Sequence, residues 1–281
     1  MKVYANAKIN LCLDVTGKRD DGYHNVCMIM QEITLCDILD IEITDSEDIV
    51  LMCDSQNVGQ ADDNLCTKAA LLFFEKTGIK KGCSISLKKN IPVCAGLGGG
   101  SSDAACVLKT LNTLCHSPLS DDELASLGLT LGADVPFFIK GKTALCEGIG
   151  EILTPIASKE KFWVALIKPD ADISTKEAYK RIDSEAIVHP DTKKATKVME
   201  EGNMNELYKL CSNVFEDVSI KDFPQIKEIK EHFMSKGAKF SMMSGSGPTV
   251  FGIFDTEKEA NEAFISYGGK IQGGGVAQTV V

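Results

Sequence analysis

The chain has 281 residues, of which 44% are hydrophobic and 25% charged, which is the composition of an ordinary globular protein. Its formal net charge of -10 argues against nucleic acid or a membrane surface as a partner, because both attract a surplus of Lys and Arg. The eleven cysteines include no C-x-x-C pair, so neither a zinc site nor a secreted disulfide framework is predicted. We expect a cytoplasmic protein without a signal peptide or a membrane span.

The first segment is predicted to be a strand. Apolar residues at odd positions from Val3 to Leu13 alternate with polar residues, among them Lys8 and Asn10. This pattern predicts one face in a core and leaves Lys8 and Asn10 on the opposite, polar face. A charged turn rich in glycine follows at residues 17–24.

Strands and helices are mixed along the rest of the chain. Strands are expected at residues 26–33, 38–43, 49–53, 83–87, 143–146, 151–153, 162–167, 239–243, 249–254 and 276–280. Helices are expected at residues 64–77, 104–114, 121–131, 192–201, 205–213, 225–236 and 257–266, and after a capping box formed by Ser174 and Glu177. Because the pattern lapses at residues 154–161, the chain is predicted to form two α+β lobes, 1–155 and 156–281.

A glycine-rich segment lies between a predicted strand and an amphipathic helix. It reads Pro-Val-Cys-Ala-Gly-Leu-Gly-Gly-Gly-Ser-Ser-Asp over Pro92–Asp103. The glycines remove side chains that would hold a phosphate away from the backbone N–H groups, and Ser101 or Ser102 is expected to cap the helix. The amides and dipole of a helix N-terminus favour an anion, so the segment predicts a polyphosphate site.

Two established phosphate loops do not fit this segment. No Gly-Lys-Ser/Thr ends it, so it is not a Walker A loop, and Ser101 occupies the last glycine position of G-x-G-x-x-G. A flexible linker or a tight turn is the alternative interpretation. Four glycines in five positions between two well-patterned elements argue against that alternative.

Three motifs in order resemble the galactokinase, homoserine kinase, mevalonate kinase and phosphomevalonate kinase (GHMP) superfamily. They are Ala7–Leu11, the glycine-rich segment, and Ser244–Phe251, a glycine turn that is expected near the phosphate loop. The elements Lys18–His24 and Gly132–Phe138 resemble the members that act on a cytidine diphosphate-linked methylerythritol. Together the motifs span nearly the whole chain.

The resemblance implies the GHMP kinase fold, with an N-terminal lobe like ribosomal protein S5 domain 2, a ferredoxin-like C-terminal lobe and the active site between them. It also implies phosphorylation of the 2-hydroxyl of the methylerythritol unit by ATP, in non-mevalonate isoprenoid precursor synthesis. Mg²⁺ is expected to bind mainly through the ATP phosphates, because Mg²⁺ is usually held by phosphate oxygens and water rather than by a protein cage. The oligomeric state does not follow from the sequence.

Lys8 and Asp134 are the candidate catalytic residues. Asp134 lies between a glycine and a proline, on a bent turn, and is the candidate base for the acceptor hydroxyl. An ammonium at Lys8 would keep Asp134 ionised and screen charge on the transferred phosphoryl group. Both positions match the catalytic Lys and Asp of the superfamily. The alternative interpretations are a solvated strand residue for Lys8 and a helix cap for Asp134.

Five further residues are expected to bind the substrate. Asn10 shares a face with Lys8 and can hydrogen-bond the acceptor or a phosphate. The resemblance implies that Tyr23 and His24 hold the cytosine ring and that Tyr179 covers its other face. The alternative interpretation of Tyr179 is simple packing of a helix. Thr175 lies near Tyr179 in the sequence and is included for that reason.

The nucleotide contacts follow from the resemblance and from the glycine-rich segment. Asn64 matches a position near adenine, and Lys89 precedes the loop as in the superfamily. The remaining predicted ATP-binding residues are Pro92, Val93, Cys94, Ala95, Gly96, Leu97, Gly98, Gly99, Gly100, Ser101 and Ser102.

Two other functions are consistent with these motifs. One is another small-molecule kinase of the superfamily, of the homoserine or mevalonate type, and the other is a nucleotide-binding regulator without activity. A phosphoryl-acceptor substrate that lacks a nucleobase needs no aromatic side chains to stack on it. The presence of Tyr23, His24 and Tyr179 therefore argues against the first function. The presence of both Lys8 and Asp134 argues against the second.

Overall fold

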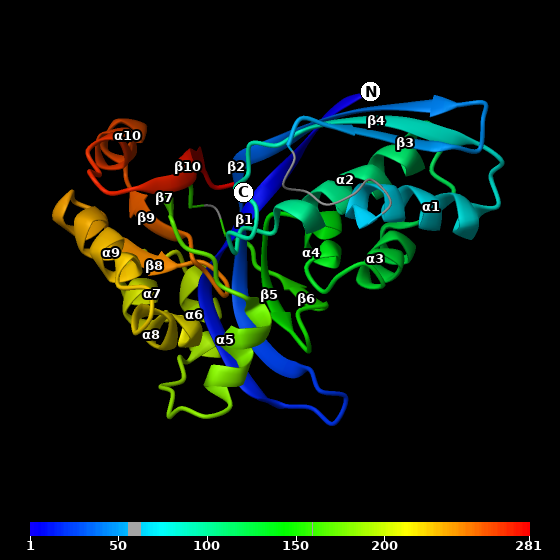
Figure 1. Cartoon of the computed structure of the whole chain (residues 1–281). Helices are drawn as coiled ribbons and strands as arrows, with labels where there is room; N and C mark the ends of the chain where they lie inside the picture. The colour runs from blue at the N-terminus through cyan, green and yellow to red at the C-terminus, as the bar shows by residue number, and fades with distance from the viewer. Residues whose placement is uncertain (56–62, 159) are drawn as a thin grey trace. The chain divides into compact units, whose positions relative to one another are not determined.

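The computed structural model describes residues 1–55, 63–158 and 160–281, and the chain divides into two compact units (Figure 1). Unit 1 contains Met1–Ala7, Cys36–Val93 and Gly98–Gly141. Unit 2 contains Lys8–Leu35, Cys94–Leu97 and Lys142–Val281. The two longest strands, β1 (Lys2–Lys18) and β2 (His24–Thr44), pair with each other and run through both units.

The sheet of unit 1 is covered by helices. β4 (Gly82–Lys88) pairs antiparallel with the C-terminal part of β2 and parallel with β3 (Ile49–Cys53). α1 (Leu65–Thr77) packs on β3 and β4, and α2 (Gly99–Leu114) packs on α1. α3 (Asp121–Leu129) and α4 (Val135–Lys140) pack on each other and on α2.

Unit 2 contains the N-terminal part of β2 and a separate antiparallel sheet. β2 pairs with β5 (Thr143–Glu147), and β5 pairs with β6 (Ile152–Pro155). The separate sheet has the order β10-β7-β9-β8. Its strands are β7 (Trp163–Pro169), β8 (Phe240–Met243), β9 (Val250–Phe254) and β10 (Ile271–Gln278).

The helices of unit 2 are α5 (Thr175–Ile182), α6 (Thr192–Glu200), α7 (Met204–Leu210), α8 (Val214–Ile220), α9 (Gln225–Ser235) and α10 (Glu257–Ile265). α9 and α10 pack on the separate sheet, where Phe233, Phe251 and Phe254 are fully buried. Phe251 and Phe254 lie three residues apart on β9 and therefore point to opposite faces of the sheet, and Phe233 of α9 packs edge-on against Phe254. Burial of each of these side chains contributes about 1.5–3 kcal/mol. Mixed strands and helices with two distinct sheets confirm the predicted α+β class.

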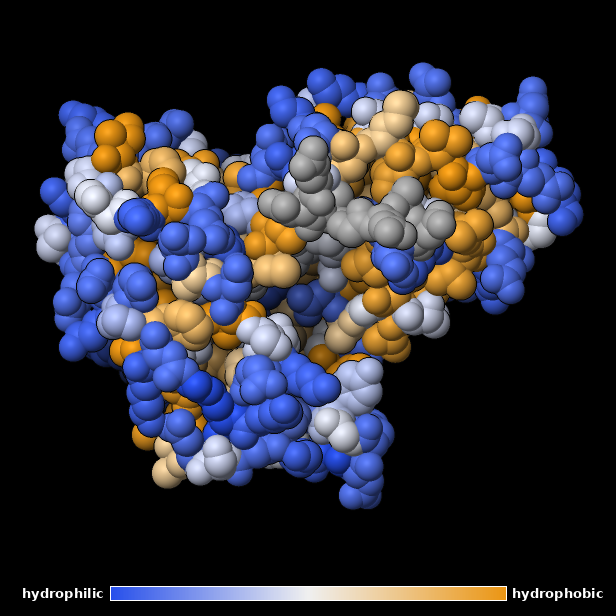
Figure 2. Space-filling view, in the orientation of Figure 1, coloured by the Kyte–Doolittle hydropathy of each residue, from blue (hydrophilic) through white to orange (hydrophobic). Residues whose placement is uncertain are grey.

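The molecular surface carries both hydrophilic and hydrophobic residues. Figure 2 shows hydrophobic residues over α1 and α3, where Leu71 and Leu129 are among the exposed apolar side chains. Across the described residues, no helix is both long and apolar enough to cross a membrane.

Two sequence predictions about secondary structure are wrong in their bounds. The segments 26–33 and 38–43, predicted as separate strands, belong to one continuous strand, β2, which runs through Asp37. The predicted helix 205–213 ends early, because α7 stops at Leu210 and the next helix, α8, begins only at Val214. The short helix α4 at residues 135–140 was not predicted. Short helices of six or seven residues carry too little periodicity to be recognised from the sequence.

Two predicted helix caps are also wrong. α2 begins at Gly99, and its N-cap is Gly98, so Ser101 and Ser102 lie inside the helix and do not cap it. Ser102 Oγ instead donates to the carbonyl of Asn6 at 2.6 Å. Ser174 is the N-cap of α5, but its side chain makes no capping hydrogen bond, so the predicted capping box with Glu177 is absent.

The predicted lobe boundary at residue 155 stays a prediction. Its linker, residues 154–161, includes residue 159, which lies outside the described residues. The expectation of a polar face on the first strand is wrong in one respect. Lys8, Asn10 and Asp14 are all buried, so both faces of β1 are covered in this region.

Candidate active site

Lys8 is bound to the glycine-rich segment through both its backbone and its side chain. Its backbone N–H donates to the carbonyl of Leu97 at 3.0 Å, and its ammonium donates to the carbonyl of Gly96 at 3.0 Å. The side chain is 4% exposed. Because a buried ammonium is unfavourable without partners, this position requires acceptors around it. The sequence therefore correctly singled out Lys8 as an unusual polar residue in a core strand.

Asn10 positions the ammonium of Lys8. Its Oδ1 accepts from Lys8 Nζ at 2.6 Å, and its Nδ2 lies 3.2 Å from Met28 Sδ. The residue is fully buried. The predicted contact between Asn10 and the substrate stays a prediction, and the geometry adds a supporting role within the protein.

The glycine turn of the third motif, Ser244–Phe251, is called here the third glycine turn. It packs directly against the glycine-rich segment. Ser244 Oγ donates to the carbonyl of Gly96 at 3.0 Å, so this carbonyl receives hydrogen bonds from both Ser244 and Lys8. Gly96 adopts φ +73°, and a Cβ at this position would collide with the carbonyl of Ser244. Only glycine permits this conformation together with so close an approach. The expected proximity of the two glycine turns is confirmed.

Asn213, at the start of α8, holds the third glycine turn in place. Its Nδ2 donates to the carbonyls of Met243 and Gly245 at 2.7 and 2.8 Å, while its Oδ1 accepts from Phe215 N at 3.0 Å. Glu216, one turn later, accepts from Met243 N at 2.7 Å. Neither residue is among the site residues predicted from the sequence. The spacing Asn-x-x-Glu, which is common at helix N-termini, was the available signal.

The start of α2 is open to an anion. Gly98, the N-cap, makes no side-chain capping bond, and the first turn of the helix contains no acidic residue. The first helical hydrogen bond runs from Ser102 N to Gly98 O at 2.9 Å. The amides before Ser102 lack helical acceptors, and together with the helix dipole they favour a phosphate.

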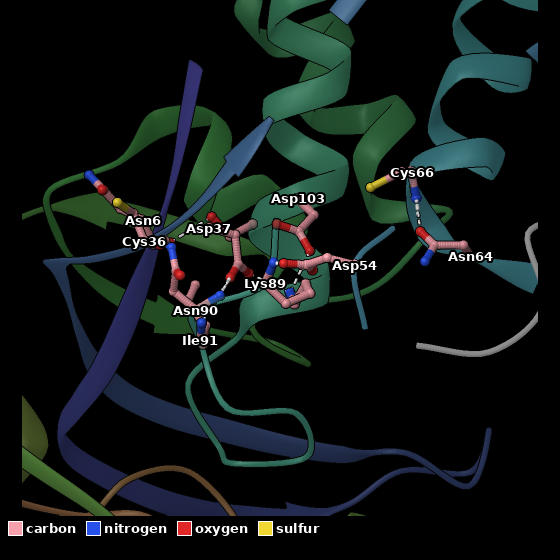
Figure 3. A network of polar contacts seen from close by, with 11 residues as sticks. Asn6, Cys36, Asp37, Asp54, Asn64, Cys66, Lys89, Asn90, Ile91 and Asp103 are labelled. Carbon is pink, nitrogen blue, oxygen red and sulfur yellow. Dashed lines mark hydrogen bonds and ion pairs between the residues drawn. The ribbon is translucent and has the colours of Figure 1, made fainter. Parts of the chain in front are cut away.

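A buried ionic network connects the two ends of the glycine-rich segment within unit 1 (Figure 3). Lys89 Nζ forms ion pairs with Asp37 and with Asp103, the latter at 2.7 Å. Asp37 Oδ1 also accepts from the backbone N–H groups of Asn90 and Ile91 at 2.5 and 2.8 Å. Asp37 and Lys89 therefore fix the chain that enters the segment, and Asp103 belongs to the helix that leaves it.

The charges in this network are not balanced, because two buried carboxylates share one ammonium. Burial disfavours the charged form of Lys89, but Asp103 and Asp37 outweigh it and raise the pKa of the ammonium. For Asp103, burial outweighs the attraction of Lys89 and raises the pKa to about 7. Among the described residues, Asp103 Oδ1 is buried without a hydrogen-bond partner, whereas both oxygens of Asp37 are bonded. A proton entering the network therefore goes to Asp103.

Asp134 is the N-cap residue of α4, followed by Val135 and Pro136. Its carboxylate makes no capping hydrogen bond, so the alternative interpretation as a side-chain helix cap is not supported. Asp134 belongs to unit 1, together with Asn64, Lys89, Pro92, Val93 and Gly98–Ser102, whereas Lys8 belongs to unit 2. Asn64 caps α1, since its Oδ1 accepts from Cys66 N at 2.8 Å.

The aromatic residues expected at the base site lie in unit 2. The His24 and Tyr179 rings are stacked, with centroids 4.7 Å apart and planes 23° apart, and Tyr179 meets the edge of Phe215 at 4.9 Å. Tyr23 is 62% exposed. Thr175 Oγ1 lies 2.9 Å from Ser246 Oγ on the third glycine turn. Rings stacked at this distance leave no room for a base between His24 and Tyr179.

The side chains of the glycine-rich segment in unit 2 point in different directions. Ala95 and Leu97 are buried, whereas Cys94 is exposed. Within the described residues, no group of three or more His, Cys, Asp or Glu side chains is arranged to hold a metal ion.

Comparison with known proteins identifies two family domains in the chain. The GHMP kinases N terminal domain matches residues 64–142, and the GHMP kinases C terminal domain matches residues 195–264. The first match contains the glycine-rich segment and Asp134. The second contains Asn213 and the third glycine turn.

Relatives and a solved structure match almost the full length. The chain is 49% identical over 259 residues to a 4-diphosphocytidyl-2-C-methyl-D-erythritol kinase of Clostridium beijerinckii, covering 91% of each protein. It is 46% identical over 252 residues to the protein of that name from Clostridium botulinum strain Hall, covering 89% of this chain and 90% of the relative. A crystal structure of 4-(cytidine 5'-diphospho)-2C-methyl-D-erythritol kinase superposes with a TM-score of 0.82 and 32% identity, covering 99% of each chain.

Proposed function

The chain belongs to the GHMP kinase family, and from that premise we propose that it phosphorylates 4-diphosphocytidyl-2-C-methyl-D-erythritol with ATP. The reaction transfers the γ-phosphoryl group to the 2-hydroxyl of the methylerythritol unit and releases ADP. It is a step of the non-mevalonate route to isoprenoid precursors. Identities of 46 and 49% to two kinases of this name favour this substrate over homoserine or mevalonate.

The observation that carries the proposal is the position of Lys8. A buried ammonium on the carbonyl of Gly96 lies at the segment whose helix amides favour a phosphate. Phosphoryl transfer needs positioning and charge stabilisation more than covalent chemistry from the protein. Lys8 supplies a positive charge for the transferred group, held in place by Asn10. A regulator without activity would not need this charge.

Asp134 is proposed as the base that accepts the proton of the 2-hydroxyl. Its side chain is not used to cap α4. Tyr23, His24 and Tyr179 are proposed to recognise the cytosine, and Thr175 and Asn10 to contact the rest of the substrate. Thr175 is linked to Ser246 on the third glycine turn, which supports its place near the substrate.

ATP is proposed to bind the glycine-rich segment through the amides before Ser102, with Asn64 and Lys89 near the nucleoside. Mg²⁺, which neutralises phosphate charge when bound, is proposed to be held mainly by the phosphates. The ATP-binding lobe is proposed to extend to residue 155, and a second lobe from residue 156 is proposed to contribute to substrate binding through Thr175 and Tyr179. Eleven free thiols support the proposed location in the reducing cytoplasm.

An ADP-release assay tests the proposal directly. The purified chain is given ATP and Mg²⁺ with 4-diphosphocytidyl-2-C-methyl-D-erythritol, homoserine, mevalonate or galactose as acceptor. We expect release of ADP with the cytidyl acceptor only. Lys8→Met should abolish it, whereas Lys2→Met, at the exposed start of the same strand, should not. Equal activity with homoserine or mevalonate contradicts the substrate, and an active Lys8→Met variant contradicts the role of Lys8.

A further inference from the structure

Asp183, at the C-terminal end of α5, binds two residues of the charged turn region. Its Oδ1 lies 2.7 Å from His24 Nε2, and its Oδ2 accepts from Lys18 Nζ at 2.5 Å. The side chain of His24 is 8% exposed and that of Asp183 is 29% exposed. Neither the sequence motifs nor the proposed catalytic roles account for this carboxylate.

The charge of Asp183 determines which nitrogen of His24 carries the hydrogen. The hydrogen bonds from Lys18 and then from His24 lower the pKa of Asp183, so the carboxylate is ionised and can only accept. His24 Nε2 must therefore be the N–H donor in this contact. In a neutral imidazole the other nitrogen is then an acceptor. Across the described residues, His24 Nδ1 makes no hydrogen bond with the protein.

The plane of the His24 ring is fixed as well. One face of the ring stacks on Tyr179, and Tyr179 is in turn held against the edge of Phe215. A ring held by stacking on one face and by Asp183 at Nε2 has little freedom to flip. His24 therefore presents one edge with a lone pair at Nδ1.

We propose that Asp183 is a specificity-determining residue, which makes His24 Nδ1 an acceptor for the exocyclic amino group of cytosine. The inference rests on the proposed function, which places the base of the substrate at His24. Cytosine carries an amino donor at C4, whereas uracil carries an oxygen acceptor there. An acceptor at Nδ1 pairs with cytosine and repels uracil. Asp183 thus selects a cytidine diphosphate-linked substrate over its uridine counterpart without touching the base.

Substitution of Asp183 tests the inference through substrate preference. In Asp183→Asn the side-chain amide can donate to His24 Nε2, which favours the opposite tautomer with a hydrogen on Nδ1. We expect the ratio of kcat/KM for the cytidine substrate to that for the uridine substrate to fall by about tenfold. Asp183→Glu keeps the acceptor and should recover part of the ratio. Asp217→Asn makes the same charge change at an exposed position of α8 and should leave the ratio unchanged.

Nitrogen-15 NMR of the imidazole groups tests the tautomer independently of catalysis. The chain has only four histidines, and a His24→Gln variant identifies the signal of His24. We expect the Nε2–H tautomer in the wild type and a shift toward Nδ1–H in Asp183→Asn. An Nδ1–H tautomer in the wild type, or an equal loss of both kcat/KM values in Asp183→Asn, overturns the inference. A wild type that phosphorylates neither nucleotide-linked substrate contradicts the proposed function, and the NMR result still decides the role of Asp183 in setting the tautomer.

Discussion

Lys8 and Asn10 show how a single polar pair can be built into a core strand. Both residues are buried in β1, where an unpartnered ammonium or amide would cost several kcal/mol. The strand tolerates them because Lys8 Nζ bonds Asn10 Oδ1 and the carbonyl of Gly96. The position of the charge is therefore set by hydrogen bonds between neighbours on one strand face and by the backbone of the glycine-rich segment.

Asp134→Asn should separate substrate binding from phosphoryl transfer. The amide keeps the shape of the side chain but cannot accept the proton of the acceptor hydroxyl, so kcat should fall by about 10²-fold or more. Equilibrium binding of ATP and of the cytidyl substrate should change little, because the carboxylate does not cap α4. The measurement is steady-state kinetics beside calorimetric titration of each ligand. Asp122→Asn, an exposed carboxylate on α3, is the matched control.

A near-normal kcat in Asp134→Asn would remove Asp134 as the base and leave transfer to positioning alone. Loss of binding together with kcat would instead show a role in holding the substrate. The two results differ in the titration, so the experiment distinguishes them.

At the scale of elements, α8 is the support of the third glycine turn. Asn213 joins the helix to two carbonyls of the turn, and Ser244 joins the turn to Gly96. The chain of contacts runs from α8 through the turn to the carbonyl that also receives Lys8. A change at the start of α8 should therefore reach Gly96 in the glycine-rich segment without altering any residue that is proposed to bind a ligand.

Asn213→Ser tests this connection. Serine is a good N-cap, so α8 should lose only a few tenths of a kcal/mol. Its short hydroxyl cannot replace an amide that donates to both Met243 and Gly245. We expect KM for ATP to rise by about tenfold, and the thermal unfolding midpoint to fall by a few degrees, because two buried carbonyls lose their donor. A lowered midpoint with unchanged KM would show that Asn213 serves the helix and not the site.

The motifs proposed to bind phosphate were easier to predict from the sequence than the residues that support those motifs through hydrogen bonds. The glycine-rich segment, Lys8 and the third glycine turn were found because their patterns are local in the sequence. Asn213 and Asp37 were missed because their partners lie about 30 and 50 residues away, in the turn at 243–245 and at 89–91. No local pattern marks Asp37, and the Asn-x-x-Glu spacing at Asn213 marks only a helix start, because the contacts of both residues with distant parts of the chain exist only after folding.

The predicted N-cap of α2 is wrong for a related reason. Ser101 and Ser102 are residue types that favour N-caps, but the left-handed conformation of Gly98 at φ +72° already begins α2. Ser102 then serves tertiary structure by bonding the carbonyl of Asn6 on β1. The propensity was correct for the residue type and wrong for this position, because α2 already begins at Gly99, after Gly98.

The stability of the whole molecule should depend on the charge of Asp103. Its pKa is raised to about 7 in the folded state from 3.8, with burial as the main cause. A carboxyl whose pKa is higher in the folded state stabilises the fold when protonated, and this stabilisation is lost as pH rises from about 4 through 7. Titratable neighbours of Asp103 are Lys89 and Asp37 in the ion network, Cys66 on α1 and Cys106 on α2.

The stability of the Asp103→Asn variant relative to the wild type should therefore increase as pH rises. The neutral amide keeps the shape of the side chain and leaves Lys89 and Asp37 as a balanced pair. The free energy of unfolding of the variant minus that of the wild type should be about 1–3 kcal/mol larger at pH 8 than at pH 5. Denaturant unfolding of both proteins at pH 5, 6, 7 and 8 measures this difference, and Asp122→Asn, whose carboxyl has a pKa lowered by Lys140, should give a flat difference over the same range. A flat difference for Asp103→Asn as well would mean that Asp103 is ionised at pH 5, and that Lys89 alone satisfies two buried carboxylates.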